Sequence, residues 1–245
     1  MKGFSKKYWA KRAEKYDRIN WVKNEEFLDT YLNMLPEKVF KKILEVGIGT
    51  GALGKIISDR IGPLIGIDIS KEMISNIDHP NIEAILADVK SLPFNSETFD
   101  LIYMRNVLHY IDEPEKGFSE INRCMKLNAY FLFSQVVSPD DSISEEYDWL
   151  VGRNIHYPTQ KEIIDMFKEF SIIKRLEYVL EKQSIMNWLN NTCNEESEKN
   201  EILQRHRDTS DHYKSLAQYE ETSKDIFVNI KHMLVLGQKR LSFRL

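Results

Sequence analysis

The chain of 245 residues contains only two cysteines, Cys124 and Cys193, too few for a disulfide framework or a four-thiolate zinc site. No apolar run approaches the ~18 residues that a membrane span requires. The first residues are charged but lack the apolar stretch of a secretory signal. The formal net charge of -4 argues against a strongly cationic nucleic-acid binder. We therefore expect a globular protein of the cytoplasm, with reduced thiols, no membrane span and no nucleic-acid partner.

Hydrophobic residues make up 42% of the chain, and short apolar runs alternate with segments compatible with helices. Continuous apolar runs predict strands that are covered on both faces, as in a parallel sheet. The expected strands are 42–46, 64–67, 82–86, 99–104, 129–136, 172–180 and 226–236. The expected helices between them are 52–59, 71–77, 114–126 and 160–167. Partial alternation in the last strand is typical of an antiparallel position, so the pattern predicts a mixed α/β fold.

Three segments without a predicted strand are too long to be ordinary connections: residues 1–36, 138–158 and 184–223. Each of them contains Trp or Tyr, which favours packed cover over disorder. We expect a single domain over residues 1–245, in which these three segments form a helical cap.

The strongest local signal is a glycine-rich turn, EVGIGTGA at residues 45–52, between a predicted strand and a predicted helix. Glycine allows positive φ and the close approach of a ligand, and the helix N-terminus offers free N–H groups. Gly47, Gly49 and Ala52 fit the dinucleotide-binding pattern. Gly47, Gly49 and Gly51 fit a different spacing, in which the acidic Glu45 precedes the loop. A tight turn that holds no ligand is the simpler alternative.

Two aspartates follow the next two predicted strands. Asp68 is placed to accept hydrogen bonds from both ribose hydroxyls of a nucleoside, and Asp88 to accept one from an adenine amine. Each aspartate alone is equally compatible with a helix cap or a turn. Because ligands of open α/β sheets bind at the carboxyl ends of strands, the loop and the two aspartates predict one nucleoside-binding crevice.

Five motifs together carry a resemblance to a known family: EVGIGTG at 45–51, GIDIS at 66–70, ADVKSLPF at 87–94, FDLIY at 99–103 and RNVLHY at 105–110. In these motifs the sequence resembles the class I S-adenosylmethionine-dependent methyltransferases, especially the small-molecule branch (ubiquinone/menaquinone methylase-like, methyltransferase type 11). The resemblance implies a Rossmann-like seven-stranded mixed sheet with the last strand antiparallel, flanked by helices. It also implies S-adenosyl-L-methionine as the cofactor.

The resemblance assigns roles to individual residues. Glu45 would lie near the ammonium group of the cofactor, Asp68 would bind its ribose, and Arg105 would lie near its methionine part. The cofactor-binding residues implied in this way are Tyr16, Glu45, Gly47, Gly49, Gly51, Asp68, Ile69, Asp88, Val89 and Arg105. A carboxylate such as that of Glu45 would face a pyrophosphate unfavourably, which favours S-adenosylmethionine over NAD.

Two histidines are candidates for catalysis. His109, in the RNVLHY motif, follows the fourth predicted strand and would serve as a base for acceptors such as phenols. The alternative is a structural histidine that caps a short helix. His156 is a weaker candidate in the predicted cap, whereas His206, between two arginines, is expected on a solvated helix face. No histidine has metal-ligand spacing, so we expect no metal.

The predicted cap would supply the acceptor site. Candidate acceptor-binding residues are Tyr8, Arg153, Tyr157 and Trp188, which favour an aromatic or anionic small molecule. We therefore expect methyl transfer to a small-molecule acceptor by in-line displacement in a capped pocket. Three alternatives stay open at this point: an RNA or protein methyltransferase of the same fold, an NAD-dependent reductase, and a non-catalytic regulator that binds the cofactor.

Overall fold

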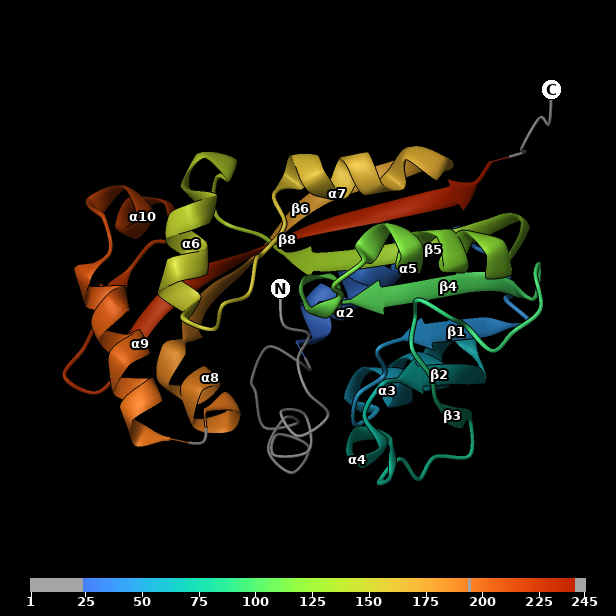
Figure 1. Cartoon of the computed structure of the whole chain (residues 1–245), viewed down its shortest axis with the longest axis horizontal. Coiled ribbons are helices and arrows are strands. Elements are labelled where there is room, and N and C mark those ends of the chain that lie inside the picture. The colour runs from blue at the N-terminus through green and yellow to red at the C-terminus, as the bar shows by residue number, and fades with distance from the viewer. Residues whose placement is uncertain (1–23, 194, 241–245) are drawn as a thin grey trace.

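The computed structural model describes residues 24–193 and 195–240, and its central feature is a mixed β-sheet (Figure 1). The sheet has eight strands in the order β3-β2-β1-β4-β5-β8-β6, and β7 pairs with β8 outside this path. The strands are β1 Ile43–Val46, β2 Leu64–Asp68, β3 Ile82–Leu86, β4 Phe99–Arg105, β5 Met125–Val136, β6 Phe170–Ser184, β7 Glu220–Glu221 and β8 Ile226–Lys239. Strands β1 to β5 run parallel, and β8 is antiparallel to both of its long neighbours, β5 and β6. This arrangement confirms the predicted Rossmann-like sheet with an antiparallel last strand.

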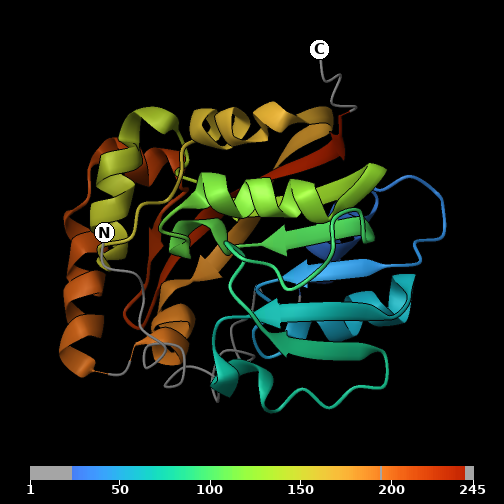
Figure 2. The same ribbon diagram turned by 45° about the vertical axis from the view of Figure 1, so that its right-hand side comes forward.

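Helices cover both faces of the sheet (Figure 2). They are α2 Glu25–Leu32, α3 Ala52–Ile61, α4 Lys71–Ile74, α5 Pro114–Cys124, α6 Ser144–Val151, α7 Gln160–Met166, α8 Ile185–Thr192, α9 Glu196–Asp208 and α10 Asp211–Leu216. Helices α2 and α3 belong to one hydrophobic core, and α5 and α7 belong to a second core on the opposite face. Burial of apolar side chains on both faces explains why the strands read as continuous apolar runs.

Strand β1 lies at the point where the strand order reverses, between β2 on one side and β4 on the other. Its four residues are all buried, including the acidic Glu45. Connections leave the carboxyl ends of β1 and β4 toward opposite sides of such a reversal, which opens a crevice there. The fold therefore provides a ligand site at the end of β1.

Strands β6 and β8 are longer than the predicted runs 172–180 and 226–236, and this is the main difference from the expected fold. Strand β5 ends its pairing with β8 at Val136 and His232, whereas β6 and β8 stay paired as far as Ser184 and Phe227. The paired ribbon thus continues past the end of β5. Helices α6, α8, α9 and α10 gather around this end of the ribbon (Figure 1).

Helix α2 packs in the core, although residues 1–36 were expected to contribute to a cap. Phe27, Leu28 and Tyr31 are completely buried. The hydroxyl group of Tyr31 lies 3.2 Å from the carbonyl oxygen of Met104 and 3.0 Å from that of Leu132, and it donates to this pair. Helix α2 therefore links the neighbouring strands β4 and β5 through Met104 and Leu132. Within the described ranges, no helix is both long and apolar enough to cross a membrane.

Candidate active site

A cavity of about 220 Å³ lies at the carboxyl ends of the parallel strands, at the reversal beside β1. It brings together most of the residues predicted to bind the cofactor: Glu45, Gly47, Gly49, Asp68, Ile69, Asp88, Val89 and Arg105. Gly51 is instead the N-cap of α3, with its Cα facing Ile77. Tyr16 and Tyr8 lie outside the described residues.

The glycine-rich loop after β1 forms a cradle that side chains would close. Gly47, Gly49 and Gly51 all have positive φ, at 73°, 56° and 78°. The backbone N–H groups of Gly47 and Ile48 both donate to the carbonyl oxygen of Ile67, at 2.8 and 2.9 Å, which folds the loop onto β2. A Cβ at Gly47 would lie 2.3 Å from Val107, whereas one at Gly49 would meet no atom within 4 Å. The loop thus leaves open space beside Gly49 for a ligand.

Asp68, at the end of β2, is held rigidly by the backbone. Its Oδ2 accepts from the N–H of Gly49 and its Oδ1 from the N–H of Ser70, both at 2.9 Å. Burial raises the pKa of Asp68, and the backbone hydrogen bonds from Ser70 and Gly49 oppose that shift. Ser70 itself caps α4 by accepting from Met73, so the capping role considered for Asp68 belongs to Ser70. The Asp68 carboxylate retains unused lone pairs toward the cavity.

Glu45 is a buried carboxyl group on β1. The hydroxyl of Tyr103 donates to its Oε2 at 2.8 Å. Helix α3 approaches this carboxyl at a glycine, because a Cβ on Gly54 would lie only 2.5 Å from the same oxygen. Burial raises the pKa of Glu45 to about 8, against the opposing effects of the Tyr103 hydrogen bond and the charge of Arg105. Glu45 is therefore poised to ionise when a cation comes beside it.

Arg105 and Asn106 close the cavity at the end of β4. The Arg105 guanidinium lies 4.2 Å from the centre of the Phe27 ring, so α2 fixes its position. Asn106 has a positive φ of 55°, and its side-chain oxygen accepts from the N–H of Val136 at 2.9 Å. Sequence reasoning missed Asn106, although asparagine directly after a strand is typical of a left-handed position.

His109 lies in the short 3-10 helix Leu108–Tyr110, next to the cavity-lining Tyr110. The amide nitrogen of Gln135 donates to the carbonyl oxygen of Val136 at 3.1 Å and lies 2.7 Å from Nδ1 of His109. Because that carbonyl needs a donor, the Gln135 nitrogen faces His109, and Nδ1 must accept. The proton of the neutral imidazole therefore resides on Nε2. The ring also stacks on Tyr157, with ring centres 4.6 Å apart.

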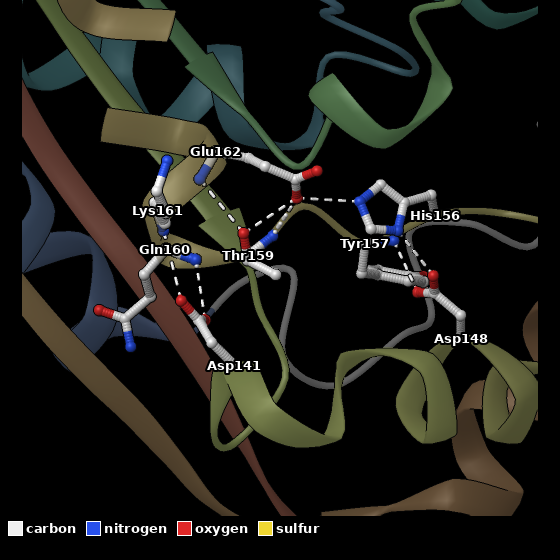
Figure 3. A network of polar contacts seen from close by, with 8 residues as sticks. All are labelled: Asp141, Asp148, His156, Tyr157, Thr159, Gln160, Lys161 and Glu162. Atoms are coloured by element: carbon white, nitrogen blue, oxygen red, sulfur yellow. Dashed lines mark hydrogen bonds and ion pairs between the residues drawn. The ribbon is translucent and has the colours of Figure 1, made fainter. Parts of the chain in front are cut away.

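His156 holds two helices together away from the cavity, as Figure 3 shows. Its Nδ1 lies 2.7 Å from a carboxylate oxygen of Asp148 on α6, and its Nε2 lies 2.9 Å from Glu162 on α7. Partial burial lowers the pKa of His156, but hydrogen bonds to the two carboxylates outweigh it, so the pKa is raised. Both ring nitrogens are thus engaged, and His156 does not line the cavity.

The same network fixes the chain on either side of Tyr157 (Figure 3). Asp148 also accepts from the N–H of Tyr157 at 2.8 Å. Thr159 and Glu162 form a reciprocal capping box at the start of α7, and Asp141 accepts from the next two backbone N–H groups. The segment before α7 therefore presents the Tyr157 ring to His109 in one orientation.

The His156 contact predicts a stability change that depends on pH. The raised pKa means that the contact stabilises fully below the ordinary histidine pKa of about 6.5 and is lost as pH rises through the folded value. The imidazole is 42% exposed, so solvent screening limits the effect. We expect His156→Ala to lower the unfolding temperature by about 1–3 °C at pH 6, and by less at pH 8. Thermal unfolding across this range measures it.

Lys161 provides the matched control for His156. Among residues 24–193 and 195–240 its ammonium forms an ion pair only with Asp165, one turn along α7, and both groups are well exposed. The decrease in unfolding temperature caused by Lys161→Ala should therefore stay nearly constant over the same pH range. If the decrease caused by His156→Ala grows with pH, this result would contradict the histidine contact.

The remaining predicted acceptor residues lie in the cap. Arg153 donates to Thr192 at 2.6 Å, and its guanidinium lies 4.4 Å from the Trp188 ring. Tyr157 and Trp188 line a second cavity, of about 60 Å³, and Arg153 does not. His206 lines this cavity as well and is only 1% exposed, so its expected place on a solvated helix face was wrong. In residues 24–193 and 195–240 no group of His, Cys, Asp or Glu is arranged to hold a metal ion.

The reversed strand order, the glycine cradle and the carboxyl groups of Glu45 and Asp68 lie together at one edge of a Rossmann-like sheet. Residues 44–133, which contain these features, match the family described as a methyltransferase domain. These residues are therefore a class I S-adenosylmethionine-dependent methyltransferase domain.

Several relatives have similar sequences. The protein MJ1123 of Methanocaldococcus jannaschii is 29% identical over 70% of this chain and 85% of its own length. Demethylmenaquinone methyltransferase of Staphylococcus aureus is 24% identical over 66% of this chain and 81% of its length. YcgJ of Bacillus subtilis, named as a methyltransferase, is 25% identical over 57% of this chain and 58% of its length. The YcgJ structure has a TM-score of 0.76 at 20% identity, covering 89% of this chain and all of YcgJ, which shows a common fold.

Proposed function

We propose that this methyltransferase binds S-adenosylmethionine in the 220 Å³ cavity and transfers its methyl group to a small-molecule acceptor that enters from the cap. The observation that carries the proposal is the glycine-rich loop, which lies beside two carboxyl groups with different surroundings. Asp68 is fixed by two backbone donors, and Glu45 is buried with a pKa raised to about 8. A nucleoside and an ammonium group are the two ligand parts that suit these carboxyls.

Bound S-adenosylmethionine supplies an electrophilic methyl group on a sulfonium centre. Asp68 accepts from the ribose hydroxyls, and its backbone anchors keep the carboxylate in place for them. Glu45 ionises beside the ammonium group, while Arg105 lies at the methionine end of the cavity. Asp88 and the backbone of Val89 meet the adenine edge, and Ile69 packs against its face. These residues orient the cofactor, and orientation is the main requirement of an in-line displacement.

His109 acts on the acceptor side, where Tyr110 and Tyr157 adjoin it. The Gln135 amide keeps Nδ1 as an acceptor, so the imidazole presents Nε2–H. This arrangement favours His109 as a hydrogen-bond donor that positions the acceptor. A role as base requires the Gln135 amide to turn and to lose its bond to the Val136 carbonyl.

The cavity chemistry weighs against the other candidate functions. A buried carboxyl at Glu45 would repel a pyrophosphate, which disfavours an NAD-dependent reductase. The small second cavity inside the cap suits a small molecule better than an RNA or a protein side chain presented on a large surface. The relatives carry names that refer to different acceptors, so the acceptor must be inferred from this chain's own residues.

Titration calorimetry with S-adenosylhomocysteine and NAD in parallel tests the proposal. We expect S-adenosylhomocysteine to bind and NAD not to bind, because only the former has an ammonium group to place beside Glu45. Incubation with methyl-labelled S-adenosylmethionine and small-molecule, tRNA and protein acceptors then separates the alternatives. Binding of NAD alone would refute the proposal, and label transfer to tRNA only would refute the small-molecule acceptor.

A further inference from the structure

The second cavity lies inside the cap, between α6, α8, α9, α10 and the extended end of β8. Its walls combine aliphatic side chains with the four aromatic side chains of Tyr147, Tyr157, Trp188 and Tyr213. Of the described residues that line it, none is Asp, Glu, Lys or Arg. The rings pack on one another, with centres 5.3 Å apart for Tyr147 and Tyr157 and 6.4 Å apart for Tyr147 and Tyr213. The cavity therefore suits an uncharged ligand, preferably one with a flat ring.

Two residues of the lining, His206 and Asn229, have polar side chains that are not tyrosine or tryptophan. The side-chain oxygen of Asn229 already accepts from the N–H of Lys182 at 2.9 Å, so we consider His206. Its Nδ1 donates to the carbonyl oxygen of Ile202, one turn back in α9, at 2.8 Å. The second nitrogen, Nε2, therefore carries no proton and can only accept. Within the described part of the chain Nε2 has no hydrogen-bond partner, and it lies on the side of the ring away from the Ile202 bond. Burial lowers the pKa of His206 to about 4, so the imidazole stays neutral at physiological pH.

The cap cavity and the cofactor cavity share a thin wall. Tyr157 lines the cap cavity and stacks on His109, and His109 in turn contacts Tyr110, which lines the cofactor cavity. A second connection joins Val136, on the cap side, to Asn106, on the cofactor side, through a hydrogen bond of 2.9 Å. A ligand that extends past Tyr157 would thus reach His109 and the cofactor site.

We propose that the cap cavity binds one end of the methyl acceptor, and that it selects an uncharged ring whose hydroxyl or N–H group donates to Nε2 of His206. The inference rests on the proposed function, because only methyl transfer makes the ligand an acceptor. At about 60 Å³ the cavity is smaller than the ~150 Å³ engineered cavity that takes up benzene. It therefore encloses one end of the acceptor, and the remainder extends toward His109.

An anionic acceptor, which the sequence also suggested, does not fit this cavity. Arg153 lies against Trp188, one of the aromatic rings of the cavity wall, and donates to Thr192, with Glu198 3.8 Å away. Its charge is thus directed at α8 and α9. An anion in the cavity would meet neutral His206 and the tyrosine rings, with no compensating charge.

Ligand-observed NMR titration with phenol, fluorobenzene and benzoate tests the selection. Phenol carries a donor, fluorobenzene has the same ring without one, and benzoate carries a charge. We expect phenol to bind roughly tenfold more tightly than fluorobenzene, which corresponds to one neutral hydrogen bond, and benzoate not to bind. His206→Leu should remove the preference for phenol. Equal binding of phenol and fluorobenzene by the unsubstituted protein would overturn the proposal.

Two further variants locate the effect. His212→Leu is the matched control, because His212 is exposed on α10 and lies outside the cavity lining, so phenol selectivity should persist. Val228→Phe should fill the cavity and abolish binding of both rings; unchanged phenol binding would place the ligand elsewhere and overturn the proposal. S-adenosylhomocysteine affinity, measured for each variant, reports the cofactor site separately. If S-adenosylhomocysteine does not bind even to the unsubstituted protein, the proposed function is refuted. The comparison of phenol with fluorobenzene still tests the selectivity of the cap cavity in that case.

Discussion

In the Glu45→Gln variant, the pH dependence of S-adenosylhomocysteine binding is expected to disappear. Glu45 has a pKa of about 8 because it is buried, so the free protein holds this group protonated at neutral pH. An ammonium group beside it lowers that pKa, and binding then releases a proton. Affinity of the unsubstituted protein should therefore rise about tenfold per pH unit from pH 6 until it levels off near pH 8.

Glutamine keeps the acceptor for the Tyr103 hydroxyl but cannot ionise. We therefore expect Glu45→Gln to bind about 10–100-fold more weakly near pH 8, with a flat profile below it. Calorimetry in buffers of different ionisation enthalpy counts the released protons, and about one is expected near pH 7 for the unsubstituted protein. Asp88→Asn is the matched control at the same cavity, because the Asp88 side chain is 37% exposed; it should weaken binding but preserve the slope.

The same substitution should stabilise the protein in the absence of ligand. A carboxyl whose folded pKa lies above its unfolded value stabilises the fold least when both states are ionised, so stability falls as pH rises from about 4.5 to 8. Glu45→Gln removes this loss and should unfold at a higher temperature near pH 8. A variant that loses stability at every pH, with an unchanged binding slope, would show that Glu45 serves only as a partner for Tyr103.

The cavity that we propose for the cofactor was predictable from sequence because the residues that line it follow the ends of strands. Parallel strands bring their carboxyl ends to one edge, so Asp68 after β2 had to lie near the loop after β1. The 2.9 Å hydrogen bond from the N–H of Gly49 to Asp68 shows that these two strand ends are in direct contact. Sequence could not tell that this contact also fixes the loop, since it depends on the positive φ of Gly49.

The acceptor side was not predictable because it depends on distant contacts. Gln135 sets the tautomer of His109 from 26 residues away. His206 stands between two arginines, which indicated a solvated face, but α9 packs against α6 and buries His206 together with Ile202 and Leu203. The neighbouring Arg205 and Arg207 keep contact with solvent. The charge of these neighbours therefore predicted an exposed side chain at position 206, where the side chain is in fact buried.

The extended ribbon of β6 and β8 explains why the C-terminal end of β6 was missed. Past the end of β5, one face of the ribbon packs on the cap through Leu180, Val228 and Ile230. Of the other positions there, Glu181 and Lys182 are exposed. A strand that is buried on a single face has apolar residues at only every second position, so its sequence signal is weaker than that of a central strand. In addition, Lys182 has a positive φ of 51°, and the pairing of β6 with β8 is interrupted there.

Asp68→Asn is expected to weaken S-adenosylhomocysteine binding by about 100–1000-fold, corresponding to the loss of two charge-assisted hydrogen bonds. The carboxylate has two roles. It accepts hydrogen bonds from the N–H groups of Gly49 and Ser70, and it retains lone pairs for the ribose hydroxyls. An asparagine oxygen can replace only one backbone acceptor, and its NH₂ group then faces the other N–H. The variant should therefore also unfold at a lower temperature.

Comparing adenosine with 2′,3′-dideoxyadenosine separates the two roles of Asp68. If the carboxylate binds the ribose, the unsubstituted protein prefers adenosine, and Asp68→Asn loses most of that preference. Ser70→Ala is the control, since it removes the cap of α4 but leaves the N–H that Asp68 accepts. It should cost about 1 kcal/mol of stability and leave the preference intact. A preference for adenosine that survives in Asp68→Asn would restrict Asp68 to holding the loop, because the discrimination between the two nucleosides would then come from other groups.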